Sequence, residues 1–123
     1  MGSSQTCGPL VSTMPDSPTP IEVDVATART LLARGEATLL DVREPDEHAI
    51  CQIAGSQLLT MREIPASLGS LPRDRRLLVL CHHGGRSARV TQFLRAHGFD
   101  HATNIRGGID AWAAELDPSI RRY

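Results

Sequence analysis

The chain has 123 residues, with 13 Lys and Arg against 14 Asp and Glu, and aromatic residues make up only 3% of it. This length predicts one compact domain whose core is built mainly from Leu, Ile, Val and Ala, and the balanced charge argues against a nucleic-acid partner because it leaves no basic excess for phosphates. No apolar run approaches the roughly 20 residues that span a bilayer and no signal peptide is recognisable, so we expect a cytoplasmic protein without a membrane partner.

The first half of the chain predicts a tail followed by alternating elements. Residues 1–20 are rich in Ser, Thr, Pro and Gly and show no hydrophobic period, which predicts a flexible N-terminal tail before a folded domain over 21–123. A strand is expected at 21–25, and then a helix that Asp24 caps and Gly35 ends. After the apolar run ATLLD, Pro45 is expected at the first position of a short helix.

The second half continues the alternation of strands and helices. The pattern predicts strands at 57–59, 75–81 and 102–105, and helices at 61–68, from Ser87 to about His97, and after Gly107-Gly108. The run RRLLVLC is apolar almost throughout, as in a strand that is covered on both faces. The helix after Gly108 is expected to place Trp112 in the core. Strands that alternate with helices predict an α/β fold with a mainly parallel sheet.

The stretch CHHGGRS, residues 81–87, carries the chemistry, because it follows the end of the most apolar strand. In open α/β sheets the functional crevice lies beyond the carboxyl ends of the strands. Gly84 and Gly85 allow the loop to curl and to point backbone N–H groups at one anion. A helix N-terminus and a cation would favour the thiolate of Cys81, which is the nucleophilic form. Arg86 could supply that cation, orient an incoming anion or tie the loop down.

Several of these residues also have a purely structural interpretation. Cys81 could be a small apolar packing residue, but an inert strand end does not need a Gly-Gly loop followed by Arg-Ser. His82 and His83 are expected to line the pocket mouth rather than to transfer protons, since adjacent loop residues rarely point together. Zinc bound by Cys81, His82 and His83 is disfavoured because this spacing cannot wrap one metal. Cys51 is expected to be a packing residue, with a resolving thiol as the alternative.

CHHGGRS, together with LLDVREPDEHAI upstream and GFDHATNIRGGIDAW downstream, resembles the rhodanese family of sulfurtransferases. The resemblance implies a three-layer α/β/α domain with a five-stranded, mainly parallel sheet, and a cysteine that carries sulfur as a persulfide. By position, the family's nucleophile falls on Cys81. The active-site loop falls on His82, His83, Gly84, Gly85 and Arg86, with Ser87 beside it. Asp41 and Arg43 match the family's Asp-Val-Arg segment near the site, which implies that Asp41 pairs with a loop arginine.

The resemblance also implies a reaction without a metal or other cofactor. The expected donor is a small molecule such as thiosulfate, and the acceptor is cyanide in an assay or a thiol or sulfur-carrier protein in the cell. Four residues separate Cys81 from Arg86, as in the sulfur-handling members, whereas the related phosphatases and arsenate reductases have one more. A non-catalytic binding module and a phosphatase or arsenate reductase are the alternatives. We expect a monomer or a weak homodimer. The ending 117–123 resembles rhodanese tails and favours a protein acceptor.

Overall fold

The computed structural model describes residues 19–123, so most of the predicted tail lies outside the described residues. The first described residues pack on the domain although the sequence places them in the tail. The Arg95 guanidinium donates hydrogen bonds to the carbonyl oxygens of Thr19, at 2.9 Å, and Pro20, at 3.0 Å. The ordered contacts therefore begin slightly before residue 21. No helix in the described part of the chain combines the length and the apolar composition that a membrane crossing needs.

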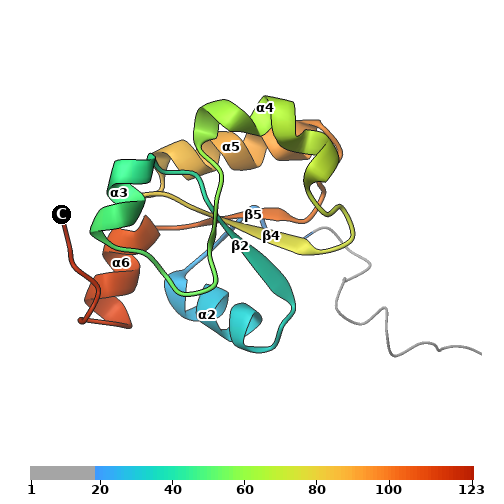
Figure 1. The fold of residues 1–123 in the computed structure, drawn as a ribbon. Helices are drawn as coiled ribbons and strands as arrows, with labels where there is room; N and C mark the ends of the chain where they lie inside the picture. Colours follow the sequence, from blue (N-terminus) through green and yellow to red (C-terminus); the bar gives the residue numbers. More distant parts are fainter. Residues whose placement is uncertain (1–18) are drawn as a thin grey trace, which may run out of the picture.

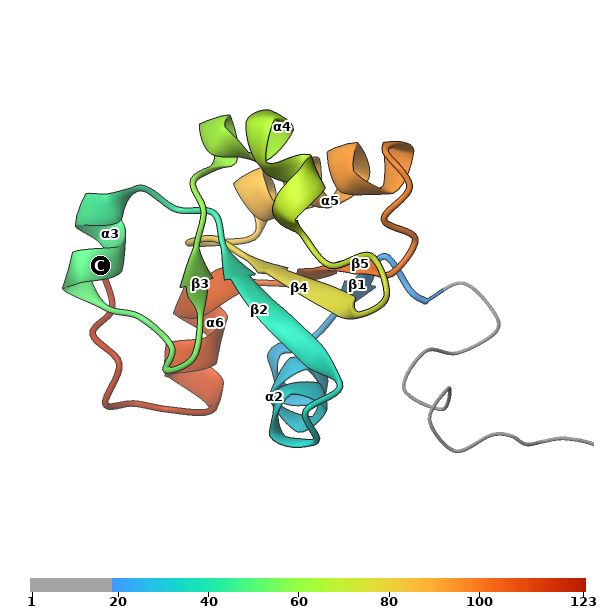
Figure 2. The same ribbon diagram turned by 45° about the vertical axis from the view of Figure 1, so that its right-hand side comes forward.

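The centre of the molecule is one five-stranded sheet in which every pairing is parallel. Its spatial order is β1-β5-β4-β2-β3 (Figures 1 and 2). The strands are β1 (Glu22–Val23), β2 (Ala37–Asp41), β3 (Gln57–Leu58), β4 (Arg76–Leu80) and β5 (Ala102–Ile105). The most apolar strand, β4, lies in the middle, as expected for a strand that is covered on both faces.

Helices cover both faces of this sheet. They are α2 (Val25–Ala33), α3 (Pro45–Ile50), α4 (Ile64–Ser67), α5 (Gly85–Ala96) and α6 (Gly108–Glu115), with 3₁₀ turns η2 (Met61–Glu63) and η3 (Leu68–Ser70). Figures 1 and 2 show α4 and α5 on one face and α2 and α6 on the other. The predicted three-layer α/β/α fold with a five-stranded parallel sheet is therefore confirmed.

The core has two halves because successive side chains of a strand point to opposite faces. In β4, Leu78 and Leu80 pack toward α2 and α6, while Leu77 and Val79 pack toward α4 and α5. All four side chains are almost completely buried, and each such burial contributes about 1.5–3 kcal/mol. The predicted core position of Trp112 is confirmed, since this residue lies in the α2–α6 half.

Two predicted elements differ from the observed ones. The strand expected at 21–25 is only β1, because Val25 already begins α2 and the Asp24 carboxylate caps that helix by accepting from the Thr27 N–H at 2.8 Å. The helix expected at 61–68 is divided into η2, α4 and η3. Pro65 explains part of this division, since it has no N–H to donate to the carbonyl four residues earlier.

Candidate active site

Cys81 follows the last residue of β4 and is only 1% exposed. Its sulfur accepts hydrogen bonds from the backbone N–H groups of Gly84, at 3.1 Å, and Ser87, at 3.3 Å. The Ser87 hydroxyl lies 3.2 Å from the same sulfur. These donors come from the loop and the first turn of α5, where the helix dipole also favours negative charge. The arrangement therefore stabilises a negatively charged sulfur at the end of β4.

Helix α5 begins at Gly85, so the prediction that it begins at Ser87 is wrong by half a turn. Gly84 is the N-cap residue with φ of +106°, a conformation that L side chains rarely adopt, and it turns the chain directly into the helix. A Cβ at Gly84 would lie only 3.2 Å from the backbone nitrogen of Gly107. Ser87 consequently belongs to the first turn, and both its N–H and its hydroxyl reach the Cys81 sulfur.

The N-terminus of α6 holds the loop that follows Cys81 through two backbone hydrogen bonds. The N–H of Ile109 donates to the Cys81 carbonyl at 2.9 Å, and the N–H of Asp110 donates to the His82 carbonyl at 3.1 Å. Gly108 makes this approach possible, because a Cβ on it would overlap both carbonyl oxygens. The sequence interpretation treated Gly107-Gly108 only as the start of a helix. The structure shows a second role for Gly108, which lets the start of α6 approach the backbone of Cys81 and His82.

The Arg86 side chain is paired with a residue of α3. Its guanidinium binds the Glu47 carboxylate through two hydrogen bonds of 2.7 and 2.8 Å. Hydrogen bonding from Arg86 lowers the pKa of Glu47 to about 2 against the opposing effect of burial, so the carboxylate is ionised at neutral pH. Of the three roles that the sequence left open for Arg86, this geometry supports the one that ties the loop down.

Asp41 and Arg43 form a second ion pair, with both side chains fully buried. The distance from Arg43 Nη2 to Asp41 Oδ2 is 2.7 Å. The prediction that Asp41 pairs with a loop arginine is therefore wrong, because the guanidinium two residues further along the chain already occupies its carboxylate. Arg43 also donates to the backbone carbonyl of Cys51 at 2.8 Å, so the pair fixes the segment that follows α3.

Tyr123 is part of this region, which the sequence did not indicate. Its ring stacks on His82 with 3.8 Å between the centroids and 6° between the planes. Its hydroxyl accepts from Arg43 Nη1 at 3.0 Å and donates to Glu47 Oε2 at 2.8 Å. Burial, together with the hydrogen bond to Glu47, raises the pKa of Tyr123 to about 12, so the hydroxyl stays protonated. Tyr123 thus joins the two ion pairs to the loop that follows Cys81.

Asn104 is a further polar residue that the sequence interpretation missed. Its side-chain oxygen lies 2.5 Å from the Ser87 hydroxyl, and its amide nitrogen donates to Glu22 at 2.9 Å. An asparagine in the short, fully buried strand β5 was the available signal, since a buried amide needs partners. The Asn104 oxygen and the Cys81 sulfur therefore share the single proton of the Ser87 hydroxyl.

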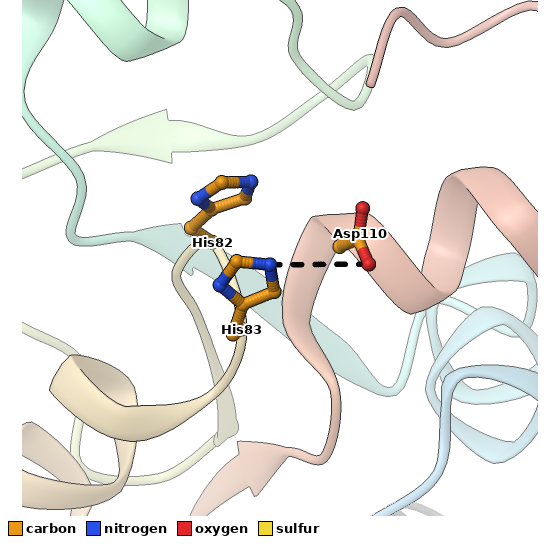
Figure 3. A group of neighbouring side chains, drawn as sticks. All are labelled: His82, His83 and Asp110. Carbon is orange, nitrogen blue, oxygen red and sulfur yellow. Dashed lines mark ion pairs between the residues drawn. The ribbon is translucent and has the colours of Figure 1, made fainter. Parts of the chain in front are cut away.

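His82, His83 and Asp110 are the described residues that come closest to a metal-binding group (Figure 3). The two imidazole rings stack at 3.8 Å, and His83 Nε2 lies 3.9 Å from Asp110 Oδ2. Arg122 already binds the Asp110 carboxylate with hydrogen bonds of 3.0 and 3.2 Å, so a cation would have to compete with a guanidinium. Burial, and then the charge of His83, lowers the pKa of His82, which favours its neutral form.

Cys51 lies at the end of α3 and packs in the α2–α6 half of the core, whereas Cys81 packs in the other half. Cys51 is a free, buried thiol whose sulfur lies 3.8 Å from Arg43 Nη1. It lines a cavity of about 600 Å³ together with Trp112 and Leu116. These contacts agree with a packing residue, and the role of resolving thiol stays a prediction.

A strand-end cysteine whose sulfur faces the first N–H groups of a helix is the arrangement of proteins that use a cysteine thiolate as nucleophile. The family model described as "Rhodanese-like domain" matches residues 24–115. The chain belongs to the rhodanese-like domain family.

Named relatives agree with this assignment. A protein named "Sulfurtransferase" from Allochromatium vinosum is 37% identical over 100 residues, which cover 80% of this chain and 94% of that protein. The probable adenylyltransferase/sulfurtransferase MoeZ from Mycobacterium tuberculosis is 38% identical over 87 residues, which cover 69% of this chain and 22% of MoeZ. The chain spans a third or less of the length of this and other long relatives. The structure of human single-domain sulfurtransferase TSTD1 matches with a TM-score of 0.73 and 28% identity, covering 79% of this chain and 98% of TSTD1.

Proposed function

We propose that this chain is a sulfurtransferase that moves sulfane sulfur from a donor such as thiosulfate to a thiophilic acceptor through a persulfide on Cys81. The observation that carries the proposal is the pair of backbone N–H donors, from Gly84 and Ser87, that face the Cys81 sulfur. The Ser87 hydroxyl lies beside them and shares its proton with Asn104. Membership of the rhodanese-like family and the sulfurtransferase names of two relatives support the reaction class.

In the first step, the Cys81 thiolate attacks the outer sulfur of thiosulfate. A new S–S bond forms on Cys81, the bond between the two donor sulfurs breaks, and sulfite leaves with its electron pair. The donors that face the Cys81 sulfur are near enough to stabilise the charge that develops on the persulfide. Because backbone N–H groups supply this stabilisation, the step needs no histidine as a base.

In the second step, an acceptor nucleophile attacks the terminal sulfur of the persulfide. The S–S bond breaks, the acceptor keeps the transferred sulfur, and Cys81 returns to the thiolate. Cyanide would serve as the acceptor in an assay, and a thiol or a sulfur-carrier protein in the cytoplasm. The MoeZ relative, whose name combines an adenylyltransferase with a sulfurtransferase, favours a protein acceptor.

The two alternatives make different demands on the same loop. A phosphatase or arsenate reductase would have to seat a tetrahedral oxyanion in a loop that has only four residues between Cys81 and Arg86. A non-catalytic binding module would have no use for hydrogen-bond donors that converge on a thiol. Turnover of p-nitrophenyl phosphate or arsenate would favour the first alternative.

Intact mass spectrometry after incubation with thiosulfate tests the proposal. We expect the reduced protein to gain the mass of one sulfur atom, which cyanide then removes. Cys81→Ser should show no gain, whereas Cys51→Ser should load sulfur like the parent protein. The proposal fails if no donor, thiosulfate or a persulfide, adds sulfur, or if Cys81→Ser loads as well as the parent.

A further inference from the structure

Three described arginines in and around the loop and Tyr123 are each paired with one carboxylate. Arg86 binds Glu47, Arg43 binds Asp41 and Arg122 binds Asp110. The Arg43–Asp41 pair is fully buried, so it offers nothing to a ligand. Arg86 follows the glycines of the loop and is the guanidinium that an anionic donor near Cys81 would meet. Its pairing with Glu47 therefore bears on which donors the site accepts.

The Glu47 carboxylate is fixed through both of its oxygens. Oε1 accepts from Arg86 Nη1 at 2.7 Å and from the N–H of Glu44 at 3.0 Å. Oε2 accepts from Arg86 Nη2 at 2.8 Å and from the Tyr123 hydroxyl at 2.8 Å. The side chain of Glu47 is only 17% exposed, and its lowered pKa keeps it charged. Its position and its negative charge are therefore constant features of the site.

A dianionic donor gains little from a guanidinium that is held in this way. To reach Arg86 it must displace Glu47, which leaves a largely buried carboxylate without its counter-ion, and removing one partner of such a pair is costly. If the donor leaves the pair intact, it meets a guanidinium whose charge Glu47 already neutralises, so it gains little electrostatic attraction. A donor with less negative charge on its leaving group depends less on a free guanidinium.

We propose that Glu47 is a specificity-determining residue that disfavours dianionic donors such as thiosulfate relative to persulfides. With a persulfide donor, the Cys81 thiolate attacks the outer sulfur, the bond to the inner sulfur breaks, and a thiolate leaves with the electron pair. The proton of the donor stays on the transferred sulfur, so no oxidant or reductant is needed. This inference rests on the proposed sulfurtransferase function and adds the charge class of the preferred donor.

The test measures the second-order rate of sulfur loading on Cys81 by intact mass, without an acceptor, using thiosulfate and cysteine persulfide. Glu47→Gln keeps an oxygen for Arg86 but removes the charge. We expect it to raise the thiosulfate rate about tenfold and to change the persulfide rate by less than about threefold. Asp46→Asn is the matched control, because it removes the same charge from the neighbouring, exposed position of α3. It should leave both rates near those of the parent.

The double variant Glu47→Gln/Arg86→Gln separates a specificity role from a structural one. If Glu47 acts by occupying Arg86, the double variant loses the gain in thiosulfate rate. The inference is overturned if Glu47→Gln leaves the thiosulfate rate unchanged, or if it lowers both rates together while thermal unfolding shows a folded protein. If neither donor loads sulfur on the parent protein, the proposed function itself fails. Equal thiosulfate rates for the parent and Glu47→Gln would overturn only the inference about Glu47.

Discussion

Gly108 is the residue whose replacement tests most directly how α6 supports the loop that follows Cys81. It has φ of +62°, and a Cβ there would overlap the carbonyl oxygens of Cys81 and His82. Gly35 has a similar φ of +70° at the end of α2, but a Cβ there would meet nothing within 4 Å. Gly108→Ala and Gly35→Ala therefore share the backbone strain and differ in the steric overlap.

The backbone conformation costs an alanine about 1–2 kcal/mol at either position. The overlap at Gly108 adds about 1–3 kcal/mol, which is the usual cost of overpacking a site that cannot relax freely. We therefore expect Gly108→Ala to lower the free energy of unfolding by about 2–5 kcal/mol and Gly35→Ala by about 1–2 kcal/mol. Against a total of about 5–15 kcal/mol, the difference is large enough to measure.

Urea unfolding of both variants gives this difference directly. At a slope of about 1–3 kcal/mol per molar urea, the midpoint of Gly108→Ala should lie roughly 1 M below that of Gly35→Ala. Gly108→Ala should also slow sulfur loading of Cys81, because the displaced carbonyls belong to the active-site loop, while Gly35→Ala should not. Equal midpoints for the two variants would refute the steric argument.

Three further predictions follow from the contacts of the site. The folded protein lowers the pKa of Glu47 from 4.5 to about 2, so this group stabilises the fold above pH 4.5 and the stabilisation is lost as the pH falls toward 2. Glu47→Gln should therefore reduce the dependence of the unfolding free energy on pH over that range, and parallel curves for parent and variant would contradict this. The folded protein raises the pKa of Tyr123 from 10 to about 12, so its contribution to stability is complete below pH 10 and is lost as the pH rises toward 12. Tyr123→Phe should not show this loss of stability, which unfolding curves measured between pH 10 and 12 would test. Ser87→Ala should slow sulfur loading by about three- to tenfold, because it removes a hydroxyl that shares its proton between the Cys81 sulfur and Asn104. Ser87→Thr keeps the hydroxyl, and equal rates for all three proteins would argue against this role.

Much of the fold follows from local patterns. The cap at Asp24, the start of α3 at Pro45 and the alternating faces of β4 depend on residues within one or two turns of each other, so the sequence shows them directly. The stretch CHHGGRS also indicates its own chemistry, because the end of an apolar strand and the start of a helix bracket a cysteine with two glycines. Loop composition and spacing were enough to nominate Cys81.

The partners of the site could not be read in the same way. Glu47 and Arg86 are 39 residues apart, Arg43 and Tyr123 are 80 apart, and Ser87 and Asn104 are 17 apart. They meet because the strand order β1-β5-β4-β2-β3 places the carboxyl ends of β2, β4 and β5 side by side, and a parallel order is not encoded in any single segment. Local patterns in the sequence are enough to predict the layered α/β fold and the cysteine at the end of β4. The pairing of Arg86 with Glu47 and the support of the loop by Gly108 and Tyr123 depend on which segments the sheet brings together, so they become visible only in the folded protein.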